Sequence, residues 1–361
     1  MKINAIKNHN LHRLLKRYPI NFITAKIKIL FLQHENFKLM ARILTGIQST
    51  GTPHLGNLLG AIIPAIELSK DIENESLFFI ADLHSFTTIR DANLLRENTY
   101  ATAAAWLAFG FDANTNLFYR QSDVTEVCEL NWYLNCFASF NRLQLAHSFK
   151  DKFDRIRDVT AGLFTYPTLM AADILLYDSH IVPVGKDQIQ HLEITRDIAS
   201  RFNNIFPNTF VLPEIKVDER VMIVPGTDGK KMSKSHNNFI DIFLSDNKLR
   251  KQIMSIKTDS TPVEHPKDSK TCNVFKLYKL LASDLQSDVL QEKYTKGSYG
   301  YGSAKEELFE LICDKYKSER EKFNYLMNNK DIIDLELDKG AKKARLIARD
   351  VLSRVRKNIG Y

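Results

Sequence analysis

The stretch Gly46-Ile47-Gln48-Ser49-Thr50-Gly51-Thr52-Pro53-His54-Leu55-Gly56-Asn57 joins a short apolar run, 42–47, to a segment whose apolar residues recur at helical spacing. The run predicts a β-strand and the spacing predicts a helix, with Thr52 as its N-cap and Pro53 in its first turn. In an open α/β sheet, ligands lie at the carboxyl ends of strands, where a helix N-terminus offers free N–H groups to phosphate. The stretch therefore predicts a phosphate site. By itself it also fits a capped helix start with an incidental histidine, favoured by roughly two to one.

Short apolar runs alternate with helical segments from residue 41 to about residue 240, which is the pattern of βαβ units and a parallel sheet. The expected strands are 42–47, 77–80, 117–119, 181–184 and 221–224. Beyond them the segments 247–256, 273–283, 303–328 and 338–358 have the spacing of amphipathic helices. The sequence thus predicts an α/β protein with a doubly wound parallel sheet domain, 41–240, and a helical C-terminal domain, 241–361.

The net charge of +7 is concentrated at the N-terminus, because residues 1–40 hold eight basic residues and one acidic residue. The rest of the chain is neutral, so overall basicity is no argument for nucleic-acid binding, and no DNA partner is expected. The segment 1–40 has no serine and only two arginines, unlike a transit peptide. We expect the functional chain to start at Met40. The basic residues of 338–358 form a local patch that could meet RNA phosphates, although a solvated helix face is the commoner explanation.

Membrane insertion and a zinc site are not expected. The longest apolar candidate, 27–32, is far shorter than the roughly 20 residues of a spanning helix. Four cysteines show no Cys-x-x-Cys pair and no histidine at zinc-ligand spacing. Unpaired thiols fit a reducing compartment, so the sequence predicts a cytoplasmic protein without a protein-bound metal.

A second stretch, Asp228-Gly229-Lys230-Lys231-Met232-Ser233-Lys234-Ser235, follows the last expected strand. Two lysines separated by small or flexible residues on a glycine-led loop can fold over a triphosphate, although lysine- and serine-rich turns are common. Two such stretches in this order, each after a strand, are far less common by chance. Together they predict chemistry at the α-phosphate of ATP.

The pair resembles the HIGH and KMSKS signatures of class I aminoacyl-tRNA synthetases. The resemblance implies a Rossmann-like catalytic domain, ATP as substrate and Mg²⁺ held by ATP oxygens and water rather than by protein ligands. It implies catalytic roles for His54, Asn57, Lys152, Lys231 and Lys234. It implies ATP contacts from Gln48, Ser49, Thr50, Gly56, Asn57, Gly185, Lys186, Asp187, Val221, Lys231, Met232, Ser233, Lys234 and Ser235.

The segment 162–177 is almost entirely apolar, with one carboxylate, Asp173, in the middle. Asp173 could be a cap or an ion-pair partner on a buried helix. A lone ionisable group on an apolar helix is nevertheless costly unless something satisfies it, and a ligand N–H would do so. The segment resembles tryptophanyl-tRNA synthetases, in which the matching aspartate accepts a hydrogen bond from the indole N–H. The resemblance extends over most of 41–361, including Asp82-x-His84, 149–152, 182–188, 191–197, 257–260 and 299–302.

From this resemblance we expect L-tryptophan to contact Asp173, Met170, Leu44, His84, Gln188, Val182 and Val184. For Met170, Leu44, Val182 and Val184, an ordinary place in the core is about equally plausible. The family also implies tRNA(Trp) as partner, a homodimer, and anticodon binding by 241–361. Two departures stand out: Lys186 occupies a position that is acidic in many members, and Asn57 replaces the second histidine of the first signature.

Three other functions are considered. Tyrosyl-tRNA synthetases share the architecture, but they normally place a glutamine one turn before the aspartate, whereas this chain has Met170. A nucleotidylyltransferase acting without tRNA would not need the helical region or the lysine loop. A non-catalytic RNA-binding paralogue would not be expected to keep the candidate site residues.

Overall fold

The computed structural model describes residues 40–71, 73–146, 160–217 and 223–361. Residues Ala41–Tyr361 form one compact unit, whereas 1–39 lie outside the described residues. Within the described part, the sheet contains β1 (Ala41–Ile47), β2 (Asn74–Ile80), β3 (Leu117–Arg120), β4 (Ile181–Val184) and β5 (Glu214–Val217). The helical segments between the strands are α3 (Leu55–Asn57), η1 (Leu58–Ile62), α4 (Ile63–Ser69), α5 (Asp82–Phe86), α6 (Ala92–Ala108), η2 (Gln121–Asp123), α7 (Glu126–Asn135), α8 (Phe140–Gln144), α10 (Ala161–Leu175), η3 (Lys186–Gln188) and α11 (Ile189–Ile205). After the last strand come η4 (Lys234–His236), α12 (Asp246–Met254), α13 (Asn273–Leu281), α14 (Asp284–Lys296), α15 (Tyr301–Lys315), α16 (Lys317–Asn328) and α17 (Lys330–Ile359).

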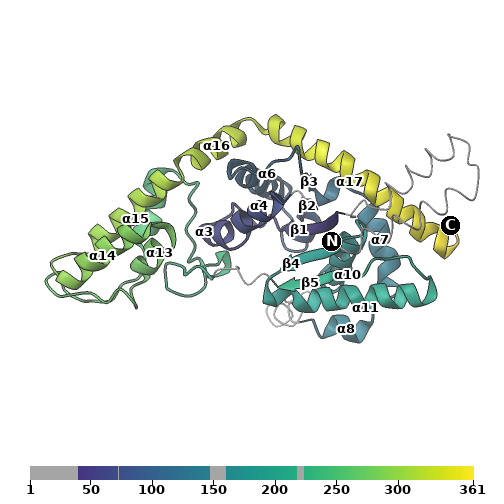
Figure 1. The fold of residues 1–361 in the computed structure, drawn as a ribbon, viewed down its shortest axis with the longest axis horizontal. Coiled ribbons are helices and arrows are strands. Elements are labelled where there is room, and N and C mark those ends of the chain that lie inside the picture. The colour runs from purple at the N-terminus through teal and green to yellow at the C-terminus, as the bar shows by residue number, and fades with distance from the viewer. Residues whose placement is uncertain (1–39, 72, 147–159, 218–222) are drawn as a thin grey trace, which may run out of the picture. The chain divides into compact units, whose positions relative to one another are not determined.

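The described strands pair in parallel in the order β3-β2-β1-β4-β5 (Figure 1). β1 pairs with β2 along its length, from Ala41↔Asn74 to Ile47↔Ile80, and with β4 on its other side. The strand order runs outward from β1 in two directions, to β2 and β3 on one side and to β4 and β5 on the other. Where the strand order reverses in this way, a crevice is expected at the carboxyl ends of the two neighbouring strands, here β1 and β4. The predicted doubly wound parallel sheet is confirmed.

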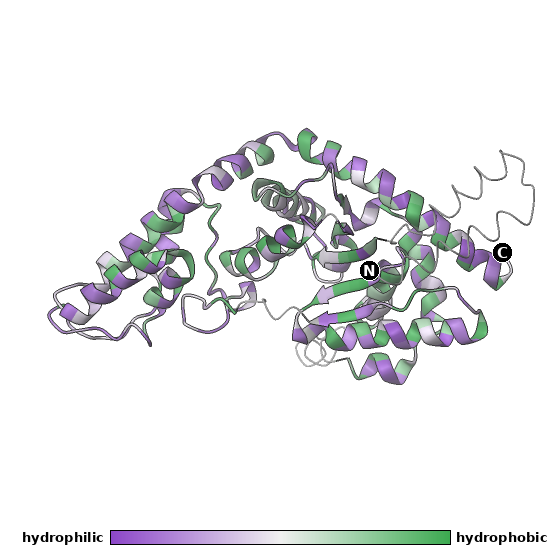
Figure 2. Ribbon diagram, viewed as in Figure 1, coloured by the Kyte–Doolittle hydropathy of each residue, from purple (hydrophilic) through white to green (hydrophobic). Residues whose placement is uncertain are grey.

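Helices cover both faces of the sheet. Leu77 and Phe79 of β2 belong to one buried cluster, which α7, α10, α11 and α17 complete. Phe78 and Ile80 belong to a second cluster with α3, η1 and α6, because successive strand residues point to opposite faces. In Figure 2, α11 and α17 alternate between apolar and polar colours, as helices with one buried face do.

The helical region after residue 240 is confirmed, since the described elements beyond that point are all helices. Its helices α13, α14 and α15 contribute Leu277, Leu290 and Leu308 to the same apolar cluster as α3 and α6. The division into two domains at residue 240 stays a prediction.

The expected strand 221–224 is wrong. Residues 223 and 224 lie outside the sheet, and 221–222 lie outside the described residues. The fifth strand is instead β5, which pairs with β4 from Ile181↔Glu214 to Val184↔Val217. Glu214-Ile215-Lys216-Val217 alternates polar and apolar residues, as an edge strand does, so it lacks the continuous apolar run used to find the others.

Two helix predictions also need correction. The segment 303–328 is two helices, α15 and α16, divided at Tyr316. The helix α14 was not expected, because its sequence is mostly polar; it starts at the Ser283 cap, whose Oγ accepts the Gln286 N–H at 3.3 Å. α17 begins eight residues before the expected 338.

Several basic side chains of α17 form ion pairs with carboxylates of the same protein. Arg345 and Arg349 both pair with Glu126 of α7, at 3.0 and 2.9 Å. Arg356 pairs with Glu129 of the same helix at 2.6 Å. Arg354 pairs with Asp178, so all four arginines of 338–358 have carboxylate partners, and the predicted alternative in which this patch meets RNA phosphates keeps fewer free charges.

Gly340 allows α17 to pack directly on β3. A Cβ added at Gly340 would overlap the Phe118 carbonyl oxygen, which is a backbone atom that cannot turn away. Gly340→Ala is therefore expected to lower the free energy of unfolding by about 3 kcal/mol, despite alanine's better helix propensity. Gly302→Ala in α15 is the matched control: a Cβ there meets nothing within 4 Å, so a gain of up to about 1 kcal/mol is expected. Denaturant unfolding measures both, and equal effects would contradict the packing argument.

Candidate active site

The two predicted nucleotide loops lie against each other. The backbone N–H of Gly56 donates to Met232 Sδ at 3.2 Å, across 176 positions of sequence. A Cβ added at Gly51 would lie 3.0 Å from Lys234 Nζ. Gly51 also has φ of +125°, which favours glycine. The lysine loop therefore lies beside the helix start that follows β1.

His54, rather than the predicted Thr52, caps α3. His54 Nδ1 accepts the Asn57 N–H, and Asn57 Oδ1 accepts the His54 N–H, both at 3.2 Å. Burial, followed by the charge of Lys234, lowers the pKa of His54 to about 4, although a backbone hydrogen bond opposes the shift. At neutral pH the ring is neutral. Because Nδ1 acts as an acceptor, the ring hydrogen is assigned to Nε2, which leaves an N–H donor.

Asn238 fixes the lysine loop from inside. Its Oδ1 accepts the Ser233 N–H at 2.7 Å, and its Nδ2 donates to Asp228 Oδ1 at 2.7 Å and to the Lys231 carbonyl at 3.1 Å. Asn238 is buried, whereas the Lys231 side chain is exposed. The loop backbone is thus held without using either signature lysine side chain.

Lys234 has a charge that the protein only partly compensates. Burial lowers the pKa of Lys234 to about 8, and the carboxylate of Asp241 opposes that shift. Within the described residues, Lys234 makes no ion pair with Asp241 within 4.0 Å. Burial likewise raises the pKa of Asp241, which accepts the Phe243 N–H at 2.9 Å. An anionic ligand in the crevice would restore the charge balance of Lys234.

A cavity of about 290 Å³ lies at the carboxyl ends of β1, β2 and β4, closed on one side by α10. Its wall contains the seven residues expected to contact the aromatic substrate: Leu44, His84, Met170, Asp173, Val182, Val184 and Gln188. Gln48, predicted for ATP, lines the same cavity, and Gly46, Phe79, Ala81, Tyr166 and Ile174 complete it. A mostly apolar wall with a few polar side chains is typical of a small-molecule site.

Asp173 is buried and has two protein partners. His84 Nε2 lies 2.9 Å from Asp173 Oδ2, and Gln121 Nε2 donates to Oδ1 at 2.8 Å. Burial raises the pKa of Asp173, while the hydrogen bonds from His84 and Gln121 lower it. The alternative in which Asp173 has an ion-pair partner within the protein is therefore present, because His84 and Gln121 already supply donors, and the contact with a ligand N–H stays a prediction. The observation that supports a ligand contact is instead that Asp173 lines the cavity.

Gln121 and Tyr166 are residues of the site that sequence reasoning missed. Gln121 follows β3 in a polar run without a recognisable pattern, although its place after a strand end was a usable signal. Tyr166 lies in the quoted apolar segment, four positions before Met170 on the same helix face. Its hydroxyl lies 3.0 Å from His191 Nε2.

Some predicted ATP residues lie elsewhere or are outside the described part. Ser49 is fully buried, and its N–H donates to Ser85 Oγ at 2.9 Å, so it is not free for a ligand. Thr50, Lys186 and Ser235 are exposed, and Gly185 follows β4 directly. Lys152, Val221 and the side chain of Asp187 lie outside the described residues.

The described residues contain neither a metal-ligand cluster nor a membrane-spanning helix. No group of three or more His, Cys, Asp or Glu side chains there could hold a metal ion. In that same part of the chain, no helix is both long and apolar enough to cross a membrane. The four cysteines are free thiols.

Comparisons with known proteins point to one family. Residues 38–317 match the family model described as tRNA synthetases class I (W and Y). The tryptophan--tRNA ligase of Campylobacter jejuni strain RM1221 is 47% identical over 88% of this chain and 99% of its own length. The tryptophan--tRNA ligase of Rhodopirellula baltica is 46% identical over 88% of this chain and 99% of its own length.

A solved structure is also similar. The tryptophanyl-tRNA synthetase of C. jejuni, complexed with ADP and tryptophan, matches with a TM-score of 0.85 and 47% identity. The match covers 89% of this chain and 100% of that one.

Proposed function

The chain belongs to the class I tRNA synthetases for tryptophan and tyrosine, and within them to the tryptophan--tRNA ligases, and on this premise we propose that it activates L-tryptophan with ATP and transfers it to tRNA(Trp). The observation that carries the proposal is the Asp173 cavity at the end of β1, next to the crevice where His54 and Lys234 meet. The tryptophan complex of the C. jejuni relative supports the same substrate.

In the first step the carboxylate oxygen of tryptophan attacks the α-phosphorus of ATP in line. A new P–O bond forms, the bond from the α-phosphorus to the bridging oxygen breaks, and pyrophosphate leaves with its electron pair. A carboxylate is already anionic, so no general base is needed, and catalysis comes from positioning and charge stabilisation. Lys231 and Lys234 supply that stabilisation, with Lys152 from outside the described residues.

His54 acts as a neutral donor in this scheme. Its pKa of about 4 keeps the ring uncharged at neutral pH, and its Nδ1 is engaged by Asn57. Nε2–H remains available for a phosphate oxygen. Mg²⁺ would enter with ATP and would stabilise negative charge on the phosphates, without a dedicated set of protein ligands.

In the second step a ribose 2′-hydroxyl at the tRNA 3′ end attacks the acyl carbon of tryptophanyl-adenylate. The hydroxyl proton is lost, an ester forms, and AMP leaves with the bridging oxygen.

The helical region 241–361 would bind the anticodon arm. We also propose a cytoplasmic location, which the free cysteines support.

Amino-acid-dependent ATP–pyrophosphate exchange tests the proposal. The full chain is assayed with each of the twenty amino acids, and tryptophan alone is expected to support rapid exchange. Tyrosine is the competing outcome, because the matching family model covers both amino acids. Aminoacylation of tRNA then separates a ligase from a nucleotidylyltransferase. Absence of exchange with every amino acid would favour the non-catalytic paralogue.

We propose a homodimer formed through exposed apolar residues on α7, α8 and the turn after α8. Trp132, Phe140 and Leu145 are 68%, 64% and 51% exposed, and clustered exposed apolar groups mark interaction sites. Both helices pack on α10, where Phe164 lies 5.1 Å from Phe140 between ring centroids.

Trp132→Glu is expected to raise the dimer dissociation constant at least about 30-fold, because a charge would replace an aromatic side chain that the proposed interface would bury. Sedimentation equilibrium measures the effect. Tyr325→Glu on α16, where Tyr325 is 57% exposed, is the matched control and should leave the dimer intact. Identical behaviour of the two variants would place the interface elsewhere.

A further inference from the structure

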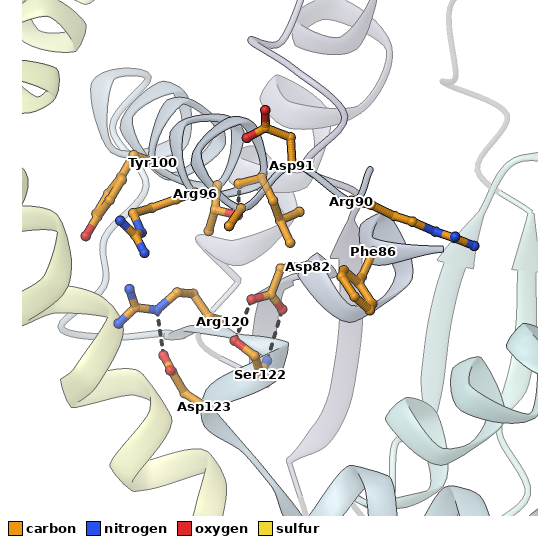
Figure 3. A pocket seen from close by; sticks show the side chains of 12 residues that line it. Asp82, Phe86, Arg90, Asp91, Arg96, Tyr100, Arg120, Ser122 and Asp123 are labelled. Carbon is orange, nitrogen blue, oxygen red and sulfur yellow. Dashed lines mark hydrogen bonds and ion pairs between the residues drawn. The ribbon is translucent and has the colours of Figure 1, made fainter. Parts of the chain in front are cut away.

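A second cavity, of about 390 Å³, lies next to the tryptophan cavity on the other side of α5. Asp82 and Phe86 of α5 line this second cavity, whereas Ala81 and His84 of the same segment line the first. Figure 3 shows Phe86 and Arg90 on one side of Asp82, and Arg96 and Arg120 on the other. We name it the α5–α6 hollow.

The acidic groups of the hollow are already engaged. Asp82 accepts the N–H and the hydroxyl of Ser122, at 3.0 and 2.5 Å. Asp91 caps α6 by accepting the N–H groups of Asn93 and Leu94, both at 2.9 Å.

Arg120 is engaged as well. It pairs with Asp123 at 2.7 Å and with Asp334 of α17 at 2.9 Å. Tyr100, another residue of the wall, donates to Asp334 at 2.9 Å. The charge of Arg120 is therefore compensated and contributes little to binding an anion.

Arg90 and Arg96 differ from Arg120. Among the described residues, neither side chain makes a hydrogen bond or an ion pair, and both are exposed. Phe86 is 58% exposed at the edge of the same hollow. The hollow thus combines two unpaired guanidinium groups with an accessible aromatic ring.

We propose that the α5–α6 hollow binds the single-stranded 3′ end of the tRNA, an inference that rests on the proposed function. Guanidinium groups that meet phosphates, with an aromatic side chain on which a base stacks, are the usual means of holding single-stranded nucleic acid. Because α5 forms a wall of both cavities, a strand lying in the hollow would be next to the cavity that would hold tryptophan, whose activated carboxyl group its terminal ribose attacks. Arg90, Arg96 and Phe86 are binding and positioning residues here, not groups acting on the reacting atoms.

The double variant Arg90→Gln/Arg96→Gln tests the phosphate contacts. The KM for tRNA in aminoacylation is expected to rise about tenfold, and the slope of log affinity against log salt to fall by about two. Tryptophan-dependent pyrophosphate exchange should be unchanged, because adenylate formation does not use the hollow. Arg201→Gln, an exposed arginine of α11 outside the hollow, is the matched control.

The ring of Phe86 is tested by a pair of variants. Phe86→Leu keeps apolar bulk but no π-face and is expected to raise the KM for tRNA about tenfold, whereas Phe86→Tyr should restore the original value. If both variants behave alike, stacking on this ring is refuted.

A truncated tRNA locates the contact on the RNA. Removing the single-stranded 3′ end should abolish the difference in binding between the double variant and the unchanged protein. A difference that persists with the truncated tRNA overturns the proposal, as does an unchanged KM and salt slope. If the unchanged protein shows no tryptophan-dependent exchange, the proposed function itself is refuted. If exchange is intact and the double variant has an unaltered KM for tRNA, only the proposed role of the α5–α6 hollow is refuted.

Discussion

Replacing Asp173 by alanine is expected to lower kcat/KM for tryptophan in pyrophosphate exchange by about 10⁴ and to remove most selectivity over phenylalanine. A site that hydrogen-bonds a substrate N–H can reject analogues lacking it by this order, and the carboxylate of Asp173 can accept that N–H in addition to its bonds with His84 and Gln121. The substitution also leaves the buried donors of His84 and Gln121 without their acceptor. Each such group costs about 1–3 kcal/mol, so the folded state is destabilised as well.

Two further variants separate recognition from folding. Asp173→Asn keeps the volume, so it should fold, but it has one acceptor oxygen in place of two, and His84 and Gln121 already compete for it, so most of the selectivity should be lost. Met170→Leu changes the same cavity without altering its polar groups; it should cost less than about 1.5 kcal/mol and preserve the tryptophan-to-phenylalanine ratio. Exchange kinetics with both amino acids measure each case. A retained ratio in Asp173→Asn would refute the assignment.

Lys234→Ala is expected to slow adenylate formation by about 10²–10³ while changing the dissociation constant of tryptophan little. That is the usual effect of removing one group that stabilises charge in a transition state. Single-turnover kinetics and tryptophan titration measure the two quantities. Lys230→Ala is the matched control, a lysine exposed on the same loop. Parallel losses in rate and tryptophan binding would instead make Lys234 a structural residue.

The pH dependence gives Lys234 a second test. Its pKa of about 8 means that the empty site holds a charged ammonium below that pH and loses the charge as the pH rises through it. We therefore expect kcat/KM for ATP to fall as the pH rises above about 8. Lys234→Arg keeps its charge throughout this range, so its profile should stay flat. An unchanged decline in Lys234→Arg would assign the titration to another group.

The residues that sequence analysis placed well are those at strand ends. Leu44, Val182 and Val184, which the resemblance assigned to the tryptophan site, lie on β1 and β4 and line one cavity; their contact with tryptophan stays a prediction. The two loops were predicted to meet because each was expected to follow a strand and each suits phosphate, although the strand expected before the lysine loop is wrong. The Gly56–Met232 contact places them together.

Other features depended on tertiary contacts that no local pattern encodes. Ser49 looks like a loop hydroxyl available to ATP, yet Ser85, distant in sequence, buries it. Gln121 bonds Asp173 across 52 positions, so only the assembled sheet reveals the pair. Three arginines of α17 look solvated, yet their carboxylate partners Glu126 and Glu129 lie on α7, more than two hundred positions earlier.

The close contact of Gly340 with β3 has a mechanical consequence. A helix whose backbone touches a strand carbonyl cannot slide or roll, and the ion pairs to Glu126 and Glu129 fasten the same helix further along. Asn329 interrupts the helical conformation just before α17, with φ of −131° and ψ of 66°. Any rearrangement of the helices α12–α16 during the catalytic cycle should accordingly hinge at Asn329, with α17 acting as part of the stationary frame.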